Sequence, residues 1–324
     1  MHNFLFISFN YMNEAYSSTS TRKAARSTIR SFHNFLTMNK WTINSPTSIK
    51  IWHLEAYVAY LKRLKQCPGT QKNKLSHLRK LMEVSGRRGF ARGQCISNQS
   101  LSIEKRSRIG TKSPVTYDEM FEFIDLNDTP EWAELCMLLS YYCGTRAAET
   151  ICQTASTYSE WSRSIMSDCQ IKITKHSKGG RPRVAIVLPH HRVVASIVCQ
   201  RISDLAFANG GFIAQYHNGL PVPKKHLALS RYATLTSAKG LQPHRLRYTY
   251  AENLTIYQLD RSVKMYDALI VVSASLGHGP SRARWVKSVY CRSLINSGKK
   301  LEQYLCAETR SSGRTNSSIP MQIA

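Results

Sequence analysis

Four separated segments of the chain contain polar residues that a helical core does not require. The first is GTRAAE, residues 144–149, where Arg146 follows the end of an apolar run and Glu149 comes three residues later. A guanidinium group in such a place needs a carboxylate or a phosphate as its partner. The segment therefore predicts either an internal Arg146–Glu149 ion pair or an arginine that Glu149 orients toward a phosphate.

The second segment is SKGGRPR, residues 177–183, which places Lys178 at a glycine-rich turn. A lysine there is either a solvated loop residue or a cation presented to a ligand. The third segment is PHRLRYTYAENL, residues 243–254, whose first proline can open a helix. His244 and Arg247 are three residues apart on that helix and share a face. Such a pair at a helix start can bind an anion and move protons near neutral pH, or it forms a surface pair.

The fourth segment is LGHG, residues 276–279, and Tyr290 lies twelve residues beyond His278. Taken alone, His278 is typical of a helix cap or a core position, and Tyr290 is typical of a core. The intervening sequence, GPSRARWVKS, contains a proline and three basic residues. It predicts a long loop before the helix that carries the tyrosine.

Three short amphipathic helices are predicted in the first third of the chain from the spacing of apolar residues. Their apolar positions are Ala25, Ile29, Phe32 and Leu36, then Leu54, Tyr57, Val58, Leu61 and Leu64, then Leu75, Leu78, Leu81 and Met82. The other faces of the third helix carry Lys72, Lys74, Arg79 and Lys80. Basic outer faces of this kind suit contact with DNA phosphates.

The rest of the chain is predicted to hold helices and one hairpin. A capping box of Thr116 and Glu119 starts this part. Further helices are predicted over residues 132–142, 191–208, around 244–256 and 262–276. The apolar period switches to two at Ile171, Ile173, Val184, Ile186 and Leu188. That pattern predicts a hairpin with Lys178 at its tip.

The segment from Gly86 to Pro114 separates these two parts and has the Gly, Ser and Asn content of a linker. Its basic residues Lys105, Arg106 and Arg108 are predicted to lie along a phosphate backbone. The predicted organisation is an N-terminal extension (1–13), a helical DNA-binding domain (14–90), a basic linker (91–111), a second domain (112–308) and a flexible tail (309–324).

The composition favours a nucleic-acid partner. The chain has 45 Lys and Arg against 20 Asp and Glu, a net charge of +25, and residues 1–111 hold 19 of the first group and 4 of the second. A field of this sign attracts polyanions. An anionic membrane surface would instead favour one basic amphipathic helix or a terminal polybasic cluster, and neither is evident. No run approaches 18 apolar residues, so no membrane-spanning segment is predicted.

The cysteines give no sign of a metal site. The nine cysteines include no C-x-x-C pair and no histidine at zinc-like spacing. The opening stretch lacks the basic region and cleavage site of a signal peptide. Reduced thiols in an intracellular protein are the simplest interpretation.

The order of the four polar segments resembles that of the tyrosine recombinase (phage integrase) family. The resemblance covers the second domain, roughly 112–308, and the basic helical first domain is similar to the core-binding domain of that family. It implies a mainly α fold with a small β-sheet (α+β), in which a helical core-binding domain precedes a catalytic domain. It also implies a site-specific recombinase or integrase of a mobile element.

The resemblance assigns the positive residues to a phosphodiester. Arg146 and Arg247 match the positions that clamp the non-bridging oxygens, and two fixed arginines can neutralise charge on those oxygens. Glu149 matches the acidic residue beside the first arginine. No metal or other cofactor is implied, since the arginines and a lysine supply the positive charge.

The remaining positions concern proton transfer and nucleophilic attack. His244 and His278 match residues that hydrogen-bond the phosphate and assist proton movement. Lys178 matches the hairpin lysine that protonates the 5′-hydroxyl leaving group. Tyr290 matches the nucleophile, which forms a 3′-phosphotyrosine. Its distance from His278 is twelve residues where nine or ten are more usual, and Tyr304 is the next tyrosine downstream.

The implied partner is double-stranded DNA, bound by a homotetramer in the synaptic complex, with no membrane partner. A cytoplasmic, nucleoid-associated location follows if the origin is prokaryotic or viral. Two alternatives stay open. A type IB topoisomerase has the same catalytic set and relaxes DNA as a monomer, and a catalytically inactive relative would keep only the fold and DNA binding.

Overall fold

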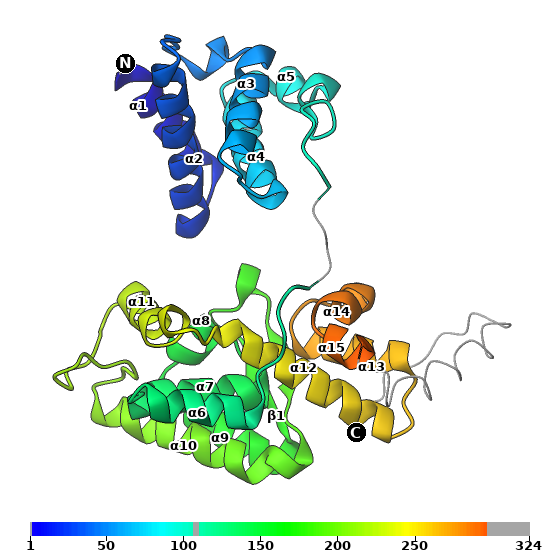
Figure 1. The fold of residues 1–324 in the computed structure, drawn as a ribbon. Helices are drawn as coiled ribbons and strands as arrows, with labels where there is room; N and C mark the ends of the chain where they lie inside the picture. Colours follow the sequence, from blue (N-terminus) through cyan, green and yellow to red (C-terminus); the bar gives the residue numbers. More distant parts are fainter. Residues whose placement is uncertain (1, 106–109, 297–324) are drawn as a thin grey trace, which may run out of the picture. The chain divides into compact units, whose positions relative to one another are not determined.

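The computed structural model describes residues 2–105 and 110–296, apart from the side chains of His2, Lys178, Ile295 and Asn296. The chain divides into two compact units, Met1–Ser107 and Arg108–Ala324. Both units are mainly helical, and the described residues contain one two-stranded antiparallel sheet (Figure 1). The predicted fold class, mainly α with a small β-sheet, is confirmed.

The first unit is a small helical bundle. Its helices are α1 (His2–Ala15), α2 (Thr19–Met38), α3 (Ile51–Arg63), α4 (Pro68–Val84) and α5 (Arg88–Arg92). Helix α2 begins after Ser18, whose side chain accepts a hydrogen bond from the backbone N–H of Thr21. The apolar positions predicted for the three helices are buried, with one exception. Leu64 follows the last residue of α3 and is exposed.

The ends of the first unit differ from the predicted domain boundaries. Helix α1 packs against α2 and α4 and buries Phe4 and Met12, where the sequence predicts an extension over residues 1–13. At the other end, Ile96, Leu101 and Ile103 are buried in the same core. The first part of the predicted linker 91–111 therefore packs with this unit. These three apolar side chains follow no helical period, which explains why their burial is not evident from the sequence.

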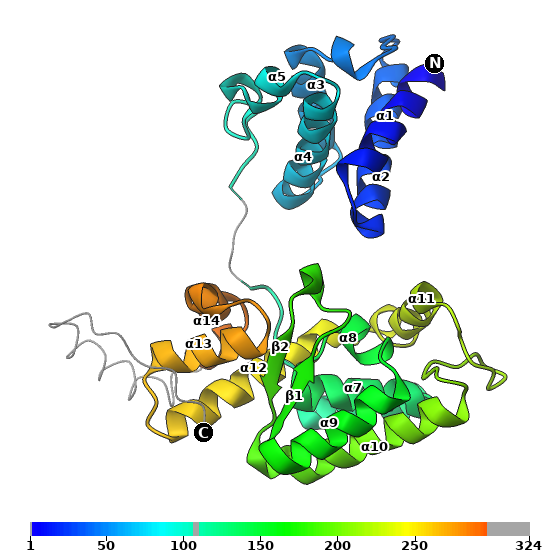
Figure 2. The same ribbon diagram turned by 180° about the vertical axis from the view of Figure 1, so that it is seen from behind.

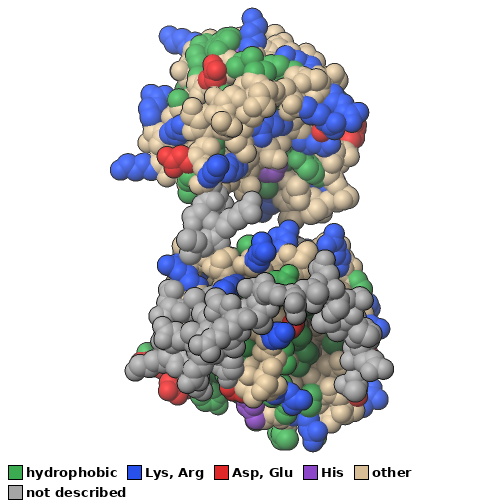
Figure 3. All heavy atoms as spheres, turned by 90° about the vertical axis from the view of Figure 1, so that its right-hand side faces the viewer, with side chains coloured by type: hydrophobic (Ala, Val, Ile, Leu, Met, Phe, Trp, Pro, Cys, Tyr) green, Lys and Arg blue, Asp and Glu red, His purple; other side chains and the backbone are tan. Residues whose placement is uncertain are grey.

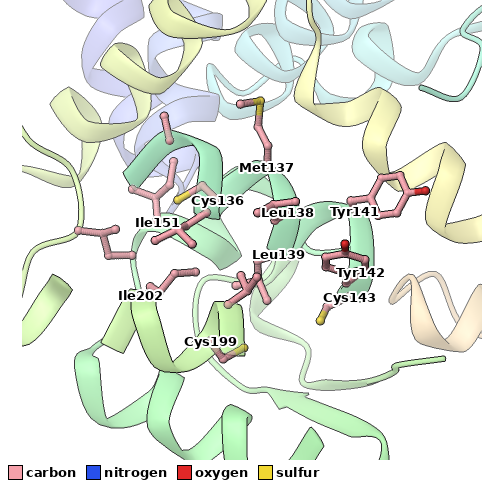
Figure 4. Packing of buried hydrophobic residues seen from close by; sticks show 14 of the residues in the cluster. Cys136, Met137, Leu138, Leu139, Tyr141, Tyr142, Cys143, Ile151, Cys199 and Ile202 are labelled. Carbon is pink, nitrogen blue, oxygen red and sulfur yellow. The ribbon is translucent and has the colours of Figure 1, made fainter. Parts of the chain in front are cut away.

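The second unit surrounds a buried helix. Its helices are α6 (Tyr117–Leu126), α7 (Glu131–Cys143), α8 (Ala147–Ile151), α9 (Ala155–Asp168), α10 (Arg192–Ala208), α11 (Lys225–Leu235), α12 (Pro243–Asp260), α13 (Met265–Ser275), α14 (Ala283–Val289) and α15 (Arg292–Asn296). Except for its acidic residues, α7 is buried throughout. Figure 4 shows its side chains packed with Ile151, Cys199 and Ile202. Helices α10 and α12 pack against it.

The sheet consists of β1 (Gln170–Ile173) and β2 (Arg183–Ile186), with Ile171 opposite Ala185 and Ile173 opposite Arg183. These four side chains are buried, whereas Val184 is 44% exposed. The buried face of β2 therefore holds Arg183 and Ala185 rather than the apolar residues whose period predicted the strand. In Figure 2 the hairpin lies between α7, α9 and α10 on one side and α12, α13 and α14 on the other.

Helices α12, α13 and α14 share a smaller core that includes Leu254, Val272 and Val286. These three helices position the predicted site residues. His244 lies in the first turn of α12, His278 follows the end of α13, and Tyr290 follows the end of α14. Within the described ranges, none of the helices is both long and apolar enough to cross a membrane.

Candidate active site

The site is built outward from the end of α7. Gly144 ends that helix with a left-handed backbone, φ +59°, and a Cβ at this position would lie 2.3 Å from the ring of Tyr250. Glycine is therefore required both for the turn and for the close approach. The turn places Arg146 immediately before α8. Glu149, in the first turn of α8, accepts a hydrogen bond from the backbone N–H of Arg146 at 2.8 Å.

The carboxylate of Glu149 is fully buried and faces three arginines. Its Oε1 lies 2.5 Å from Nη1 of Arg146, and its Oε2 lies 2.7 Å from Nη2 of Arg183 and 3.8 Å from Nη1 of Arg247. We call these four residues the charge cluster. The sequence predicted the contact between Arg146 and Glu149, which both interpretations of that segment include, but not the participation of Arg183.

Backbone carbonyl groups supply the other acceptors of the cluster. The carbonyl oxygen of Leu276 accepts from Nη2 of Arg146 and from Nη2 of Arg247, both at 3.0 Å. The carbonyl of Gly144 accepts from Nη2 of Arg183 at 3.1 Å and also from Arg247. Arg183 donates a further bond to the Ser275 carbonyl. The ends of α7 and α13 are thus joined by the guanidinium groups, because the last carbonyls of a helix lack partners within it.

The cluster is positively charged in a buried place. Burial opposes the charge on Glu149, but Arg183, Arg146 and Arg247 outweigh it and lower the pKa of the carboxyl to about 2. Burial, with the repulsion of Arg183 and Arg146, lowers the pKa of Arg247 to about 10, so it stays charged at neutral pH. Three cations around one carboxylate leave an excess of positive charge. Such an excess favours the binding of an anion.

Tyr290 lies beside this cluster and between two histidines. Its hydroxyl oxygen is 3.4 Å from Nε2 of His278 and 3.3 Å from Nε2 of His244. A tyrosine hydroxyl has one hydrogen to donate, so it donates to one histidine and accepts from the other. The histidine that accepts is positioned to take the phenolic proton. Tyr290 is 1% exposed, whereas His244 is exposed to solvent.

The electrostatic setting of His278 keeps it neutral. Burial lowers its pKa, and the positive charges of Arg247 and Arg146 lower it further, to about 3. At neutral pH its Nε2 can therefore accept the hydrogen bond from Tyr290 when the ring proton is on Nδ1. A bound anion would cancel part of the arginine charge and raise the pKa of His278.

Aromatic rings surround the side chain of Tyr290. The ring centroids of Tyr248 and Trp285 lie 4.5 Å and 5.4 Å from that of Tyr290, and Trp285 also contacts His278 at 4.6 Å. Neither residue was predicted from the sequence to belong to the site. Four predicted basic residues with described side chains and one carboxylate thus lie in the neighbourhood of Tyr290: Arg146, His244, Arg247 and His278, with Glu149.

The hairpin contributes differently from what was predicted. Lys178 lies in the turn between β1 and β2, as predicted, but its side chain falls outside the described residues. Arg183, five residues later, is 7% exposed and joins the charge cluster. The pattern of β2 gave no signal for it, because Val184 and Ile186 suggest that the opposite face is buried. The register of the hairpin places Arg183 on the face of Ile171 and Ile173.

The basic residues predicted to contact DNA in the first unit are partly engaged within the protein. Arg79 donates from Nε to the Ile96 carbonyl at 2.9 Å, and Nζ of Lys80 lies 3.2 Å from Glu83. Nζ of Lys74 donates to Ser31 at 3.1 Å. Lys72 is half-buried and Lys105 is exposed, while Arg106 and Arg108 lie outside the described residues. DNA contact by this set stays a prediction. In Figure 3, Lys and Arg side chains are spread over the visible face of each unit.

Known proteins are similar to this chain in sequence and in fold. Residues 102–253 match the sequence model of the integrase family. No curated protein sequence matches the chain. The chain is similar to the Tn1549 transposon integrase solved with circular intermediate DNA, with a TM-score of 0.54 and 12% identity over 90% of this chain and 98% of that one. It is also similar to the XerH site-specific recombinase bound to its palindromic difH substrate, with a TM-score of 0.52 and 16% identity over 87% of this chain and 80% of that one.

Proposed function

We propose that this chain, a member of the tyrosine recombinase (phage integrase) family by its sequence match and its fold, is a site-specific DNA recombinase of a mobile element. It cleaves and rejoins DNA strands through a 3′-phosphotyrosine. The observation that carries the proposal is the position of Tyr290: its hydroxyl lies between two histidines, next to a buried cluster with excess positive charge.

In the cleavage step each of these side chains has one role. The oxygen of Tyr290 attacks the phosphorus and forms a P–O bond, while the bond from phosphorus to the 5′-oxygen breaks. The phenolic proton passes to the histidine that accepts the hydrogen bond, and the 5′-oxygen takes a proton from Lys178. The guanidinium groups of Arg146 and Arg247 stabilise the charge that develops on the phosphoryl oxygens. A hydroxyl of another strand then attacks the phosphotyrosine and releases Tyr290.

The exposures within the site indicate where a phosphate enters. The side chain of Arg146 is 20% exposed and His244 is exposed, whereas Arg247 is fully buried. A phosphate therefore first meets Arg146 and His244. Full contact with Arg247 requires a local rearrangement, because its guanidinium group is fully buried and bonds to the backbone of Gly144 and Leu276.

The other expectations follow from the same assignment. Double-stranded DNA is the partner and a homotetramer forms the synaptic complex. If the origin is prokaryotic or viral, the reaction takes place in the cytoplasm at the nucleoid. A separate basic helical unit before the catalytic unit, and a structural likeness that spans both units, support a recombinase over a type IB topoisomerase. The convergence of the polar side chains around Tyr290 supports an active enzyme over an inactive relative.

The decisive experiment traps the covalent intermediate. Nicked DNA substrates from the sequences that flank the gene are incubated with the protein, and the adduct is mapped on the protein by mass spectrometry. We expect the adduct on Tyr290 and none with Tyr290→Phe. Tyr304→Phe is the matched control, because Tyr304 is the alternative nucleophile, and it should form the adduct at the original yield. Adduct of undiminished yield with Tyr290→Phe would exclude this nucleophile, and relaxation of supercoils without site dependence would favour the topoisomerase.

A further inference from the structure

The end of the predicted linker is bound on both sides of the nucleophile. The backbone N–H of Gly110 donates to the carbonyl of Ser288 at 3.0 Å, two residues before Tyr290. The carbonyl of Gly110 accepts from Nη1 of Arg292 at 2.7 Å, two residues after it. Both backbone polar groups of Gly110 are therefore used by the short segment that carries Tyr290.

The contact is too close for any other residue at position 110. A Cβ on Gly110 would lie 2.4 Å from the carbonyl oxygen of Val289 and 2.9 Å from its Cα. These are backbone atoms, which cannot rotate away as a flexible side chain can. Gly110 is buried at this contact. The glycine is thus required for the approach of the two chains rather than for an unusual turn.

The other end of the same segment is anchored on α12. Both backbone groups of Val115 bond to the hydroxyl of Thr249, with the N–H donating at 2.9 Å and the carbonyl accepting at 2.6 Å. Arg245 donates to the carbonyls of Ser113 at 3.0 Å and Pro114 at 3.1 Å. Arg245 and Thr249 lie on the part of α12 that carries His244 and Arg247. In Figure 1 this stretch of chain runs beside α14 and α12.

We propose that residues 110–115 form a strap that positions the nucleophile, with Gly110 and Arg292 as its positioning residues. This rests on the proposed role of Tyr290. The strap ties the end of α14 to the helix that carries His244, and so fixes the tyrosine hydroxyl relative to the histidines. It also makes the last residues before the second unit's helices part of the active site, rather than a passive spacer between the units.

The nucleophile needs such support because its own helix is short. Helix α14 has seven residues, and Tyr290 follows its last residue. Helices this short are marginal without tertiary contacts. The hydroxyl of Tyr290 makes two long hydrogen bonds, at 3.3 Å and 3.4 Å. The bond from Gly110 to Ser288 satisfies one of the carbonyls that the end of α14 leaves without a partner.

Single-turnover cleavage of a nicked substrate at saturating DNA tests the strap. We expect Arg292→Ala and Gly110→Ala to slow adduct formation by about tenfold or more, because a displaced nucleophile loses its alignment. The Kd for DNA should stay unchanged, and Arg292→Lys should recover part of the rate. Arg201→Ala is the control, since Arg201 forms an exposed ion pair with Glu131 on another face. Adduct formation at the original rate in both strap variants would overturn the proposal.

Hydrogen exchange on the protein without DNA tests the strap independently of catalysis. In Arg292→Ala the peptide that contains Tyr290 should exchange faster, while the peptide that contains Glu149 should not change. Unchanged exchange in both peptides would overturn the strap even if Tyr290 is the nucleophile. Faster exchange at Tyr290 in a protein that never forms an adduct would instead show that the strap exists and that the proposed function has failed.

Discussion

The charge cluster and the segment of Tyr290, the proposed nucleophile, are neighbours in the second unit, yet they are held in different ways. The cluster is buried and its guanidinium groups bond to one carboxylate and to carbonyls at the ends of α7 and α13. Tyr290 follows a helix of seven residues and is held by two long hydrogen bonds, ring contacts and the strap. Groups that stabilise charge must be fixed before the reaction, whereas the nucleophile must leave its position and return. The contrast fits that division of tasks.

Removing the carboxylate of the cluster should have the largest effect. We expect Glu149→Gln to lower the free energy of unfolding by about 3–5 kcal/mol, because the buried Arg183 and Arg247 and the partly exposed Arg146 lose the carboxylate charge that they share. Chemical denaturation measures the change. Glu131→Gln is the matched control, because Glu131 pairs with Arg201 at the surface and should cost at most about 1 kcal/mol. If Glu149→Gln lowered the free energy of unfolding no more than Glu131→Gln does, the charge cluster would not be a rigid part of the site.

Removing Arg146, the most exposed arginine of the cluster, should lower the rate of cleavage more than the free energy of unfolding. We expect Arg146→Ala to slow cleavage by about 10²-fold or more, or about 3 kcal/mol of transition-state stabilisation, while most DNA affinity is kept. Arg247→Ala should slow cleavage as well, but it should also unfold more easily, because Arg247 is fully buried. Single-turnover rates, DNA titrations and unfolding curves separate the two. If binding and cleavage by Arg146→Ala fell together, the clamp assignment would be wrong.

As the pH is lowered, the protonation of His278 should reduce the free energy of unfolding before the protonation of Glu149 does. The lowered pKa of His278, about 3, means that the unfolded chain binds a proton below about pH 6.5 that the folded chain does not. Stability therefore falls as the pH decreases through that window, whereas Glu149, with a pKa of about 2, adds its loss only below about pH 4.5. Allowing for solvent screening, we expect His278 to contribute about 1 kcal/mol between pH 7.5 and 5.5.

The measurement compares unfolding free energies at the two pH values in His278→Asn and in the unchanged protein. The variant should lose about 1 kcal/mol less. His226→Asn serves as the control, because His226 is an exposed histidine on α11. An identical pH dependence in His278→Asn and the unchanged protein would show that His278 does not carry this effect.

The sequence allowed most of the site to be predicted, because each polar residue stood out against an apolar run. Arg146 follows the largely apolar helix α7, and His278 follows the largely apolar helix α13. His244 and Arg247 both lie near the start of α12. Arg183 was missed because the apolar residues of β2 suggest the opposite buried face. The position of the arginine is decided by a partner 34 residues away, Glu149, and not by any local pattern. Helix α9 was missed as well, since its buried residues are spread among serines and threonines.

The strap also could not be predicted from the sequence. Gly110 looks like an ordinary linker glycine, and the need for it appears only when the backbone of Val289, far along the chain, lies against it. The spacing of twelve positions from His278 to Tyr290 is easier to understand. The extra length forms a turn of 3₁₀ helix over Pro280–Arg282, and the tyrosine still reaches His278.

The acceptors that hold the charge cluster are mostly main-chain oxygens, at Gly144, Ser275 and Leu276. Every amino acid carries such an oxygen, so substitutions at 275 and 276 can change the side chain without removing the acceptor. Only the arginines, the glutamate and the glycine turn are restricted to one residue type. Residues 275 and 276 can therefore change in sequence while the centre keeps its acceptors.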